Sequence, residues 1–253
     1  MLPRIVPVMI IESNKAYQTV NFELNQYLGD PISIARLYGE LGADELVIFD
    51  KSIEQPIFLN NRLRNICQEV YIPVAYGGHI NSINDADVVM SQGIEKVVIK
   101  LDSEDRFKLV ALIASKYGKQ SVVGCINYIS DSRFKSDTSY SVNHDNLDSL
   151  YAKGITAGVG ELLIQDISRS GTKLGFNLDG VSRIFKESEI PIIYAGGAND
   201  LASLRQPLLL GASGVAASTI FSLSSLGNSP LISYITHKER SVFEEFGNTS
   251  ESP

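Results

Sequence analysis

A chain of 253 residues, of which 44% are hydrophobic and 20% charged, has the composition of a globular protein and is long enough to bury a normal core. Its net charge of −7 argues against nucleic acid as the main partner, because binding to phosphate backbones needs a basic face. No apolar run approaches the roughly 18 residues of a membrane helix, and the opening MLPRIVPV lacks a signal-peptide pattern, so we expect a cytoplasmic protein without membrane contacts.

Eight apolar runs are predicted to be strands, with helix-like segments between them. The runs are continuous rather than alternating, which is typical of parallel strands buried on both faces. The segments 30–42 and 103–118 each open on a helix-start residue and close at a glycine. Eight such units predict an α/β fold, a (β/α)8 TIM barrel, as a single domain over residues 1–253 with a frayed polar tail at 239–253. The predicted strands are 4–11, 45–50, 72–76, 96–100, 121–127, 161–166, 190–195 and 214–218.

The two halves of the chain repeat each other. GADELVIFD at 42–50 matches GVGELLIQD at 158–166, and IPVAYGGHIN at 72–81 matches IPIIYAGGAN at 190–199 at nearly the same spacing. A period near half the chain predicts two half-barrels of four strand–helix units each.

Long connections follow the first and fifth predicted strands, at 12–31 and 128–145. They occupy equivalent places in the two halves. We expect both to be loops on the C-terminal face of the barrel, where the active sites of this fold form.

Two glycine pairs follow apolar strands at equivalent places in the two halves. Glycine lets a backbone approach an anion closely and point its amides at it. We therefore predict a phosphate site in each half, which together would suit an elongated ligand with a phosphate at each end. The alternative is that the glycines only make tight turns. The predicted phosphate-binding residues are Gly77, Gly78 and Lys100 in the first half and Gly196, Gly197, Ser218 and Thr219 in the second.

Neither the cysteines nor the histidines suggest a bound metal. Cys67 and Cys125 both lie in apolar runs and are predicted to be buried, reduced thiols. His79, His144 and His237 are scattered, and no pair has the spacing of metal ligands. We predict that the protein binds no metal and no cofactor.

Over residues 3–238 the chain resembles the HisF family, the cyclase subunit of imidazole glycerol phosphate synthase. The half-barrel repeat, the strand beginning GADELV, both glycine loops and AAS at 216–218 carry this resemblance. It implies a barrel that receives ammonia from a glutaminase docked on its N-terminal face. At the C-terminal face, the family uses that ammonia to cyclise a bisphosphorylated ribulosyl formimino substrate.

The resemblance places the two catalytic aspartates of the family at Ile10 and Asn127, and its loop lysine at Gln18. Isoleucine transfers no proton, and asparagine is no useful base. Each lost acid–base group removes about 10²–10⁴-fold in rate, so we expect cyclisation at background. His79 stands for a glycine of the family's first phosphate loop and Ser170 for an aspartate, so the substrate itself is also expected to differ.

Four charged residues match the family's ring that gates the passage of ammonia at the barrel floor: Arg4, Glu45, Lys96 and Glu161. Two positive and two negative charges can neutralise each other there, as buried charges must. Ordinary salt bridges that stabilise the barrel are the alternative. Glu95 matches an acidic residue at the family's glutaminase interface.

The leading hypothesis follows from a further resemblance, to a divergent HisF2-like branch found in surface-polysaccharide clusters, carried by QTVNF at 18–22 and YLGDPI at 27–32. It implies a non-cyclising barrel that docks a class I, HisH-like glutaminase and passes ammonia to a sugar amidotransferase. A second hypothesis is an enzyme on another phosphorylated substrate, with Asp50 and Asp166 as acids that point toward the barrel mouth; helix-start or loop structure is the alternative for both residues. A third is a histidine-pathway cyclase with relocated catalytic residues.

Overall fold

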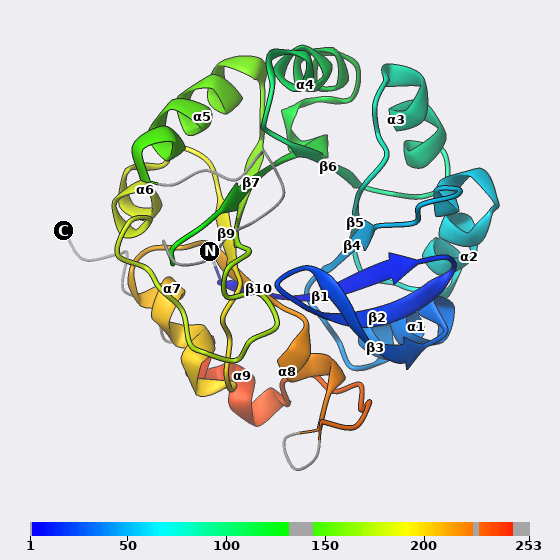
Figure 1. Cartoon of the computed structure of the whole chain (residues 1–253), viewed down its shortest axis with the longest axis vertical. Coiled ribbons are helices and arrows are strands. Elements are labelled where there is room, and N and C mark those ends of the chain that lie inside the picture. The colour runs from blue at the N-terminus through cyan, green and yellow to red at the C-terminus, as the bar shows by residue number, and fades with distance from the viewer. Residues whose placement is uncertain (1, 132–143, 225–227, 245–253) are drawn as a thin grey trace.

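The computed structural model describes residues 2–131, 144–224 and 228–244, except for the side chains of 144, 145, 242 and 244. Eight parallel strands form a closed barrel, because β10 pairs with β1 as well as with β9 (Figure 1). This confirms the predicted (β/α)8 TIM barrel, and each predicted strand agrees with an observed one to within two residues at either end. The barrel strands are β1 (Arg4–Glu12), β4 (Leu46–Asp50), β5 (Val74–Gly77), β6 (Lys96–Lys100), β7 (Val122–Tyr128), β8 (Glu161–Asp166), β9 (Ile192–Ala195) and β10 (Gly214–Ala217).

Helices surround the barrel (Figure 1). Their start signals are local: the side chain of Asp30 accepts a hydrogen bond from the Ser33 backbone N–H at 3.1 Å, and Ser82 and Asp85 form a reciprocal capping box. The described α-helices are α1 (Pro31–Glu40), α2 (Arg62–Glu69), α3 (Ile83–Met90), α4 (Glu104–Tyr117), α5 (His144–Ala157), α6 (Ser182–Glu187), α7 (Arg205–Leu209), α8 (Thr219–Ser222) and α9 (His237–Glu244). Short 3₁₀ helices lie at η1 (Ile57–Leu59), η2 (Lys119–Ser121) and η3 (Ala202–Leu204).

Alternate residues of each strand supply two separate apolar layers, as the two-residue period of a strand requires. One set packs between the strands and the helices and includes Leu46, Ile48 and Tyr76. The other fills the barrel interior. The interior set is Val6, Val8, Ile10, Val47, Ala75, Val98, Val123, Cys125, Leu163, Ile193, Ala195 and Ala216.

The segment 12–31 is not the loop that the sequence suggested. It forms an antiparallel hairpin of β2 (Lys15–Val20) and β3 (Glu23–Gly29), and β2 pairs with the end of β1. Its turn residues Asn21 and Phe22 have φ of +52° and +68°, the left-handed conformation that a tight two-residue hairpin turn needs. The equivalent connection in the second half, 128–145, lies largely outside the described residues.

The C-terminal segment is also more ordered than expected. Residues 239–244 of the predicted frayed tail belong to α9, and Phe243 is buried against the outer core. The remaining residues, 245–253, lie outside the described part. Both cysteines are unpaired thiols; Cys125 is buried inside the barrel, whereas Cys67 is only half-buried. Among the described residues, the search for a membrane-spanning helix finds none that is both long and apolar enough.

Buried tyrosines should make the fold sensitive to alkali. Burial raises the pKa of Tyr38, Tyr76, Tyr194 and Tyr234 above the usual value of 10.0, and a nearby carboxylate adds to this in the last three. The folded chain therefore keeps protons that the unfolded chain releases. The stabilising contribution of these tyrosines should be fully present below about pH 10. Above that pH the free energy of unfolding should fall by up to about 1.4 kcal/mol per pH unit for each buried tyrosine.

Urea unfolding at pH 8, 10 and 11 measures this effect. Tyr38→Phe removes one of the four hydroxyls and should give a shallower fall with pH. A free energy of unfolding that stays constant up to pH 11 would contradict the prediction.

Candidate functional site

The floor of the barrel carries a closed ring of ion pairs. Arg4 Nη1 donates to Glu45 at 2.8 Å, and Arg4 also pairs with Glu161. Lys96 Nζ completes the ring, at 2.9 Å from Glu45 Oε2 and 2.7 Å from Glu161 Oε2. The structure thus brings together all four residues predicted for the gate, at the N-terminal ends of strands from both halves.

The ring pairs two basic side chains with two acidic ones in a largely buried place. Both glutamates are almost fully buried, whereas about a fifth of each cationic side chain is exposed. Burial opposes the charge on Arg4, but hydrogen bonds and charges from Glu161 and Glu45 outweigh it and raise the pKa of the guanidinium. The ring is therefore a stable polar plug below an apolar interior.

Neighbouring contacts hold the ring in place. Asp44 accepts a hydrogen bond from the Ile5 backbone N–H at 2.8 Å and pairs with Arg240 of α9. Tyr234 donates to the Ile5 carbonyl at 2.7 Å. The C-terminal segment therefore fixes the backbone next to two ring residues. Glu95 lies exposed on the same face and accepts a hydrogen bond from the Val74 backbone N–H at 2.8 Å.

The two positions of the family's catalytic acids lie on the inner faces of their strands. Ile10 is 2% exposed and belongs to the interior cluster. Asn127 is partly exposed, and its side-chain oxygen lies 3.7 Å from the sulfur of Cys125. An apolar side chain thus occupies the first acid position and an uncharged amide the second.

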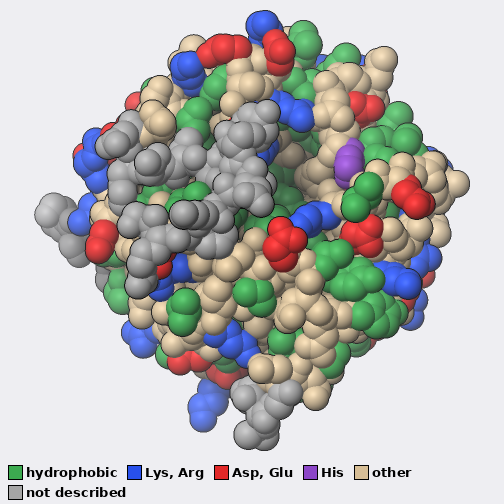
Figure 2. Space-filling model, in the orientation of Figure 1, with side chains coloured by type: hydrophobic (Ala, Val, Ile, Leu, Met, Phe, Trp, Pro, Cys, Tyr) green, Lys and Arg blue, Asp and Glu red, His purple; other side chains and the backbone are tan. Residues whose placement is uncertain are grey.

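The hairpin β2–β3 lies on the face turned toward the viewer in Figure 1, over the C-terminal ends of the strands. Phe22 at its tip packs edge-on against Phe49, 6.0 Å between ring centroids, and against the interior cluster. The Asn21 backbone N–H donates to the Ser170 carbonyl at 2.7 Å. Gln18, at the place of the family's loop lysine, is buried and donates to the Thr19 carbonyl at 2.6 Å. The hairpin therefore covers part of the mouth. Figure 2 shows a hollow near the centre of this face with charged side chains at its edge.

A pocket lies over the ends of β8, β9 and β10. It exists because small residues, Ala195, Ala198, Ala216 and Ala217 with three glycines, leave space there. It brings Gly196, Gly197, Ser218 and Thr219, all predicted phosphate residues, together with Ile10. Gln165 also lines it, and sequence reasoning missed this residue because an uncharged amide at a strand end carries no motif.

The glycine pairs have a structural role in both halves. A Cβ atom on Gly78 would lie 2.2 Å from the Asp50 carbonyl oxygen, and one on Gly196 would lie 2.3 Å from the Asp166 carbonyl oxygen. Both positions have positive φ, so only glycine fits. The predicted alternative of tight turns is thus part of the explanation. In the second half, the same packing leaves the loop at Gly197 beside the pocket.

The first-half loop is built differently. His79 takes the place of Gly197 in the repeat and holds a φ of +60°, which is costly for a residue with a side chain. Its Nε2 atom is buried and has no hydrogen-bond partner among the described residues. Lys100 forms an ion pair with Asp102 at 3.3 Å. Gly77, Gly78 and Lys100 do not line the pocket over β8–β10.

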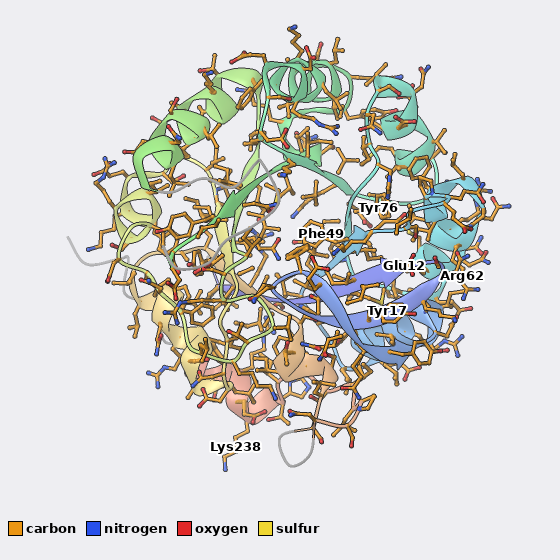
Figure 3. The ribbon with its side chains drawn as sticks, in the orientation of Figure 1. Glu12, Tyr17, Phe49, Arg62, Tyr76 and Lys238 are labelled. Atoms are coloured by element: carbon orange, nitrogen blue, oxygen red, sulfur yellow. The ribbon has the colours of Figure 1, made fainter. Side chains whose placement is uncertain are left out.

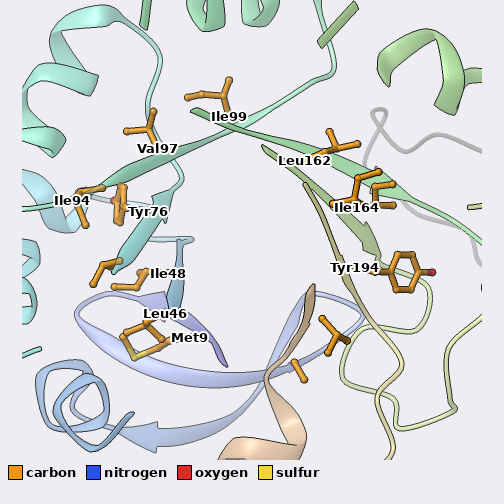
Figure 4. Close-up of a cluster of buried hydrophobic side chains, with 14 of the residues drawn as sticks. Met9, Leu46, Ile48, Tyr76, Ile94, Val97, Ile99, Leu162, Ile164 and Tyr194 are labelled. Atoms are coloured by element: carbon orange, nitrogen blue, oxygen red, sulfur yellow. The ribbon is translucent and has the colours of Figure 1, made fainter. Parts of the chain in front are cut away.

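The expectation that Asp50 and Asp166 point toward the mouth is wrong. Asp50 follows Ile48 on the outer face of β4 and accepts hydrogen bonds from the Tyr76 hydroxyl at 2.6 Å and the Ile57 backbone N–H at 2.8 Å. Figure 3 shows Phe49 nearer the barrel centre than Tyr76, and Figure 4 shows Tyr76 among the side chains of the outer layer. Asp166 is fully buried and accepts hydrogen bonds from the Ser168 backbone N–H, at 3.1 Å, and hydroxyl. Both carboxylates are structural acceptors.

The closed barrel, its two similar halves and a polar mouth above a charged floor define a half-barrel-repeat (β/α)8 protein. The sequence profile of the family described as "Histidine biosynthesis protein" matches residues 4–226. The chain belongs to this family and is a divergent, HisF-like member of it.

Relatives match over most of their length. A Leptospira borgpetersenii protein, provisionally named imidazole glycerol phosphate synthase subunit HisF, is 31% identical over 245 residues, covering 92% of this chain and 94% of the relative. The Leifsonia xyli imidazole glycerol phosphate synthase subunit HisF is 32% identical over 226 residues, covering 86% and 89%. A Pseudomonas aeruginosa protein, provisionally named as subunit hisF2 of the same synthase, is 30% identical over 242 residues, covering 91% and 95%.

Proposed function

We propose that this chain is a non-cyclising HisF-like barrel that docks and activates a class I glutaminase on its N-terminal face. Ammonia from the glutaminase passes the ring of Arg4, Glu45, Lys96 and Glu161, crosses the apolar interior and leaves at the mouth. There it is used by a sugar amidotransferase in surface-polysaccharide synthesis, and the mouth pocket binds a phosphorylated ligand.

One combination of features carries the proposal. The four ring residues form all four of the possible ion pairs between cation and acid, while Ile10 fills the position of the first catalytic acid. A chain whose function is to cyclise a substrate needs its proton-transfer groups. A chain that delivers ammonia needs the floor and the interior. The observed pattern fits the second requirement.

Glutamine hydrolysis by a co-expressed class I glutaminase tests the proposal. Adding the full chain should raise the hydrolysis rate at least about tenfold, since the docked barrel completes the partner's active arrangement. Glu95→Gln removes a charge from the N-terminal face and should weaken binding of the glutaminase about tenfold. Asp105→Asn is the control: it removes one negative charge from α4 and should leave binding of the glutaminase unchanged. If neither the binding nor the rate of the glutaminase depends on this chain, the proposal is wrong.

The alternative is the cyclase subunit of imidazole glycerol phosphate synthase, a lyase of histidine biosynthesis or a related enzyme on a phosphorylated substrate. The names of the relatives are consistent with this alternative. It needs proton-transfer groups other than Asp50 and Asp166, because both carboxylates face the helices and are occupied by hydrogen bonds.

A further inference from the structure

A second pocket, which we call the outer pocket, lies outside the barrel interior, beside α8. It has a volume of about 300 Å³ and shares no lining residue with the pocket over β8–β10. The helix α8 contributes to both, because Thr219 lines the pocket over the strand ends and Ile220 lines the outer one. Ile220 and Leu201 of the outer pocket pack against the layer between strands and helices. The two pockets are therefore separate places, and the outer one is large enough for a small ligand.

The floor of the outer pocket is aliphatic. Leu201, Ile220, Leu223 and Leu231 line it, and they come from three different segments of the chain. Leu223 is 7% exposed, whereas Leu231 is 55% exposed. The backbone at this exposed leucine is fixed, since the Leu231 N–H donates to the Ser222 carbonyl at 2.9 Å. The fold thus holds an uncovered leucine at the pocket, where an apolar group of a ligand would be favourably buried.

Two opposite charges line the same pocket without pairing with each other. The Lys173 Nζ atom donates to the side-chain oxygen of Asn228 at 3.1 Å, and Asp200 Oδ1 accepts from the Ser203 backbone N–H at 2.7 Å. An ammonium group has three donors, and a carboxylate has a second oxygen, so both groups can bind more. Lys173 also holds a φ of +58°, which is costly for a residue with a side chain. The loop therefore keeps a cation at this pocket in a strained conformation.

We propose that the outer pocket binds an aliphatic α-amino acid in its zwitterionic form. The carboxylate of the amino acid pairs with Lys173, its ammonium group pairs with Asp200, and its side chain lies on Leu223 and Leu231. A simple carboxylate or a simple amine would satisfy only one of the two charges, whereas a zwitterion satisfies both. This inference goes beyond the proposed function, because it involves neither the glutaminase nor a phosphorylated ligand at the mouth.

Binding of four small probes to the full chain, measured by saturation-transfer NMR titration, tests the proposal. L-Leucine carries all three recognised groups. 4-Methylpentanoate lacks the ammonium group, isopentylamine lacks the carboxylate, and glycine lacks the aliphatic side chain. The wild-type chain should bind leucine about tenfold more tightly than each of the other three, since each of them loses one contact.

Two variants assign the charged contacts. In Lys173→Met, leucine should bind no more tightly than isopentylamine, while its preference over 4-methylpentanoate stays about tenfold. Asp200→Asn keeps an oxygen that can accept from the Ser203 N–H, and should give the reverse pattern. Lys238→Met is the matched control, because it removes an exposed cation of α9 that does not line the pocket (Figure 3). It should leave all the ratios unchanged.

Several results would overturn the proposal. If glycine binds as tightly as leucine, the aliphatic floor plays no part in recognition. If leucine keeps its affinity in both Lys173→Met and Asp200→Asn, it binds elsewhere on the protein. A variant that weakens all four probes equally and also lowers the melting temperature has lost a structural residue. Absence of binding by every probe rejects the site, and none of these results affects the glutaminase test.

Discussion

Ammonia and the bisphosphorylated ribulosyl formimino substrate should give no cyclised product above background when the wild-type chain is the catalyst. The resemblance to the HisF family places its two proton-transfer groups at Ile10 and Asn127, and each acid–base group contributes about 10²–10⁴-fold. The rate should therefore lie at least about 10⁴-fold below that of a cyclising HisF subunit assayed beside it. Product formation can be followed by chromatography at ammonia concentrations high enough to replace the glutaminase.

The variant Ile10→Asp/Asn127→Asp extends this test. We expect no turnover from this variant either. The resemblance places Gln18 and Ser170 where the family's site has a lysine and an aspartate. In addition, burial at position 10 would keep the new carboxyl group protonated, so that it could not act as a base. Turnover by the wild type would assign the protein to histidine synthesis. Turnover by the double variant alone would show an intact cyclase substrate site, and would contradict a different ligand at the mouth.

Glu161→Gln should lower the free energy of unfolding by about 3 kcal/mol. The Glu161 side chain is 6% exposed and pairs with both Arg4 and Lys96. Without its charge, two cations share Glu45 alone. Breaking a fully buried pair costs about 3–5 kcal/mol, and the partial exposure of both cations places this case at the lower end. Urea unfolding measures the change.

Two further variants make this measurement decisive. Glu187→Gln removes an exposed acid that pairs with Arg183 at 3.1 Å, and should have almost no effect on stability. Lys96→Met/Glu161→Leu removes one cation and one acid together, and should recover much of the loss. If Glu161→Gln is as stable as the wild type, the ring contributes nothing to the fold and mutual neutralisation of its charges is not needed.

The barrel could be predicted from sequence because parallel strands buried on both faces are continuous apolar runs, and because the half-chain repeat is clear. The orientation of the Asp50 and Asp166 side chains could also have been predicted from the sequence. Each aspartate stands five residues after a floor glutamate, Glu45 or Glu161, and an odd offset along a strand reverses the face. The same count places Gln165, four residues after Glu161, inside the barrel.

The hairpin at 15–29 was harder to predict. Its turn is Asn21–Phe22, without the glycine that usually signals a two-residue turn with positive φ. The conformation depends instead on distant contacts, Phe22 with Phe49 and Asn21 with Ser170. Such contacts join segments that are apart in sequence and exist only once the barrel has formed. The pocket likewise depends on the alignment of small residues from three strands, which no single segment reveals.

The uninterrupted apolar interior has a consequence for what could cross it. Its twelve inward-facing members, from Val6 to Ala216, include neither a carboxyl group nor a basic side chain. A neutral ammonia molecule can enter such a lining at little cost, whereas an ammonium ion would lose its hydration without compensation. A carboxylic acid at position 10 would be the last group able to return a proton before the mouth. In the proposed delivery of ammonia, isoleucine at this position would make the barrel a filter on protonation state, so that ammonia entering as a nucleophile would leave as one.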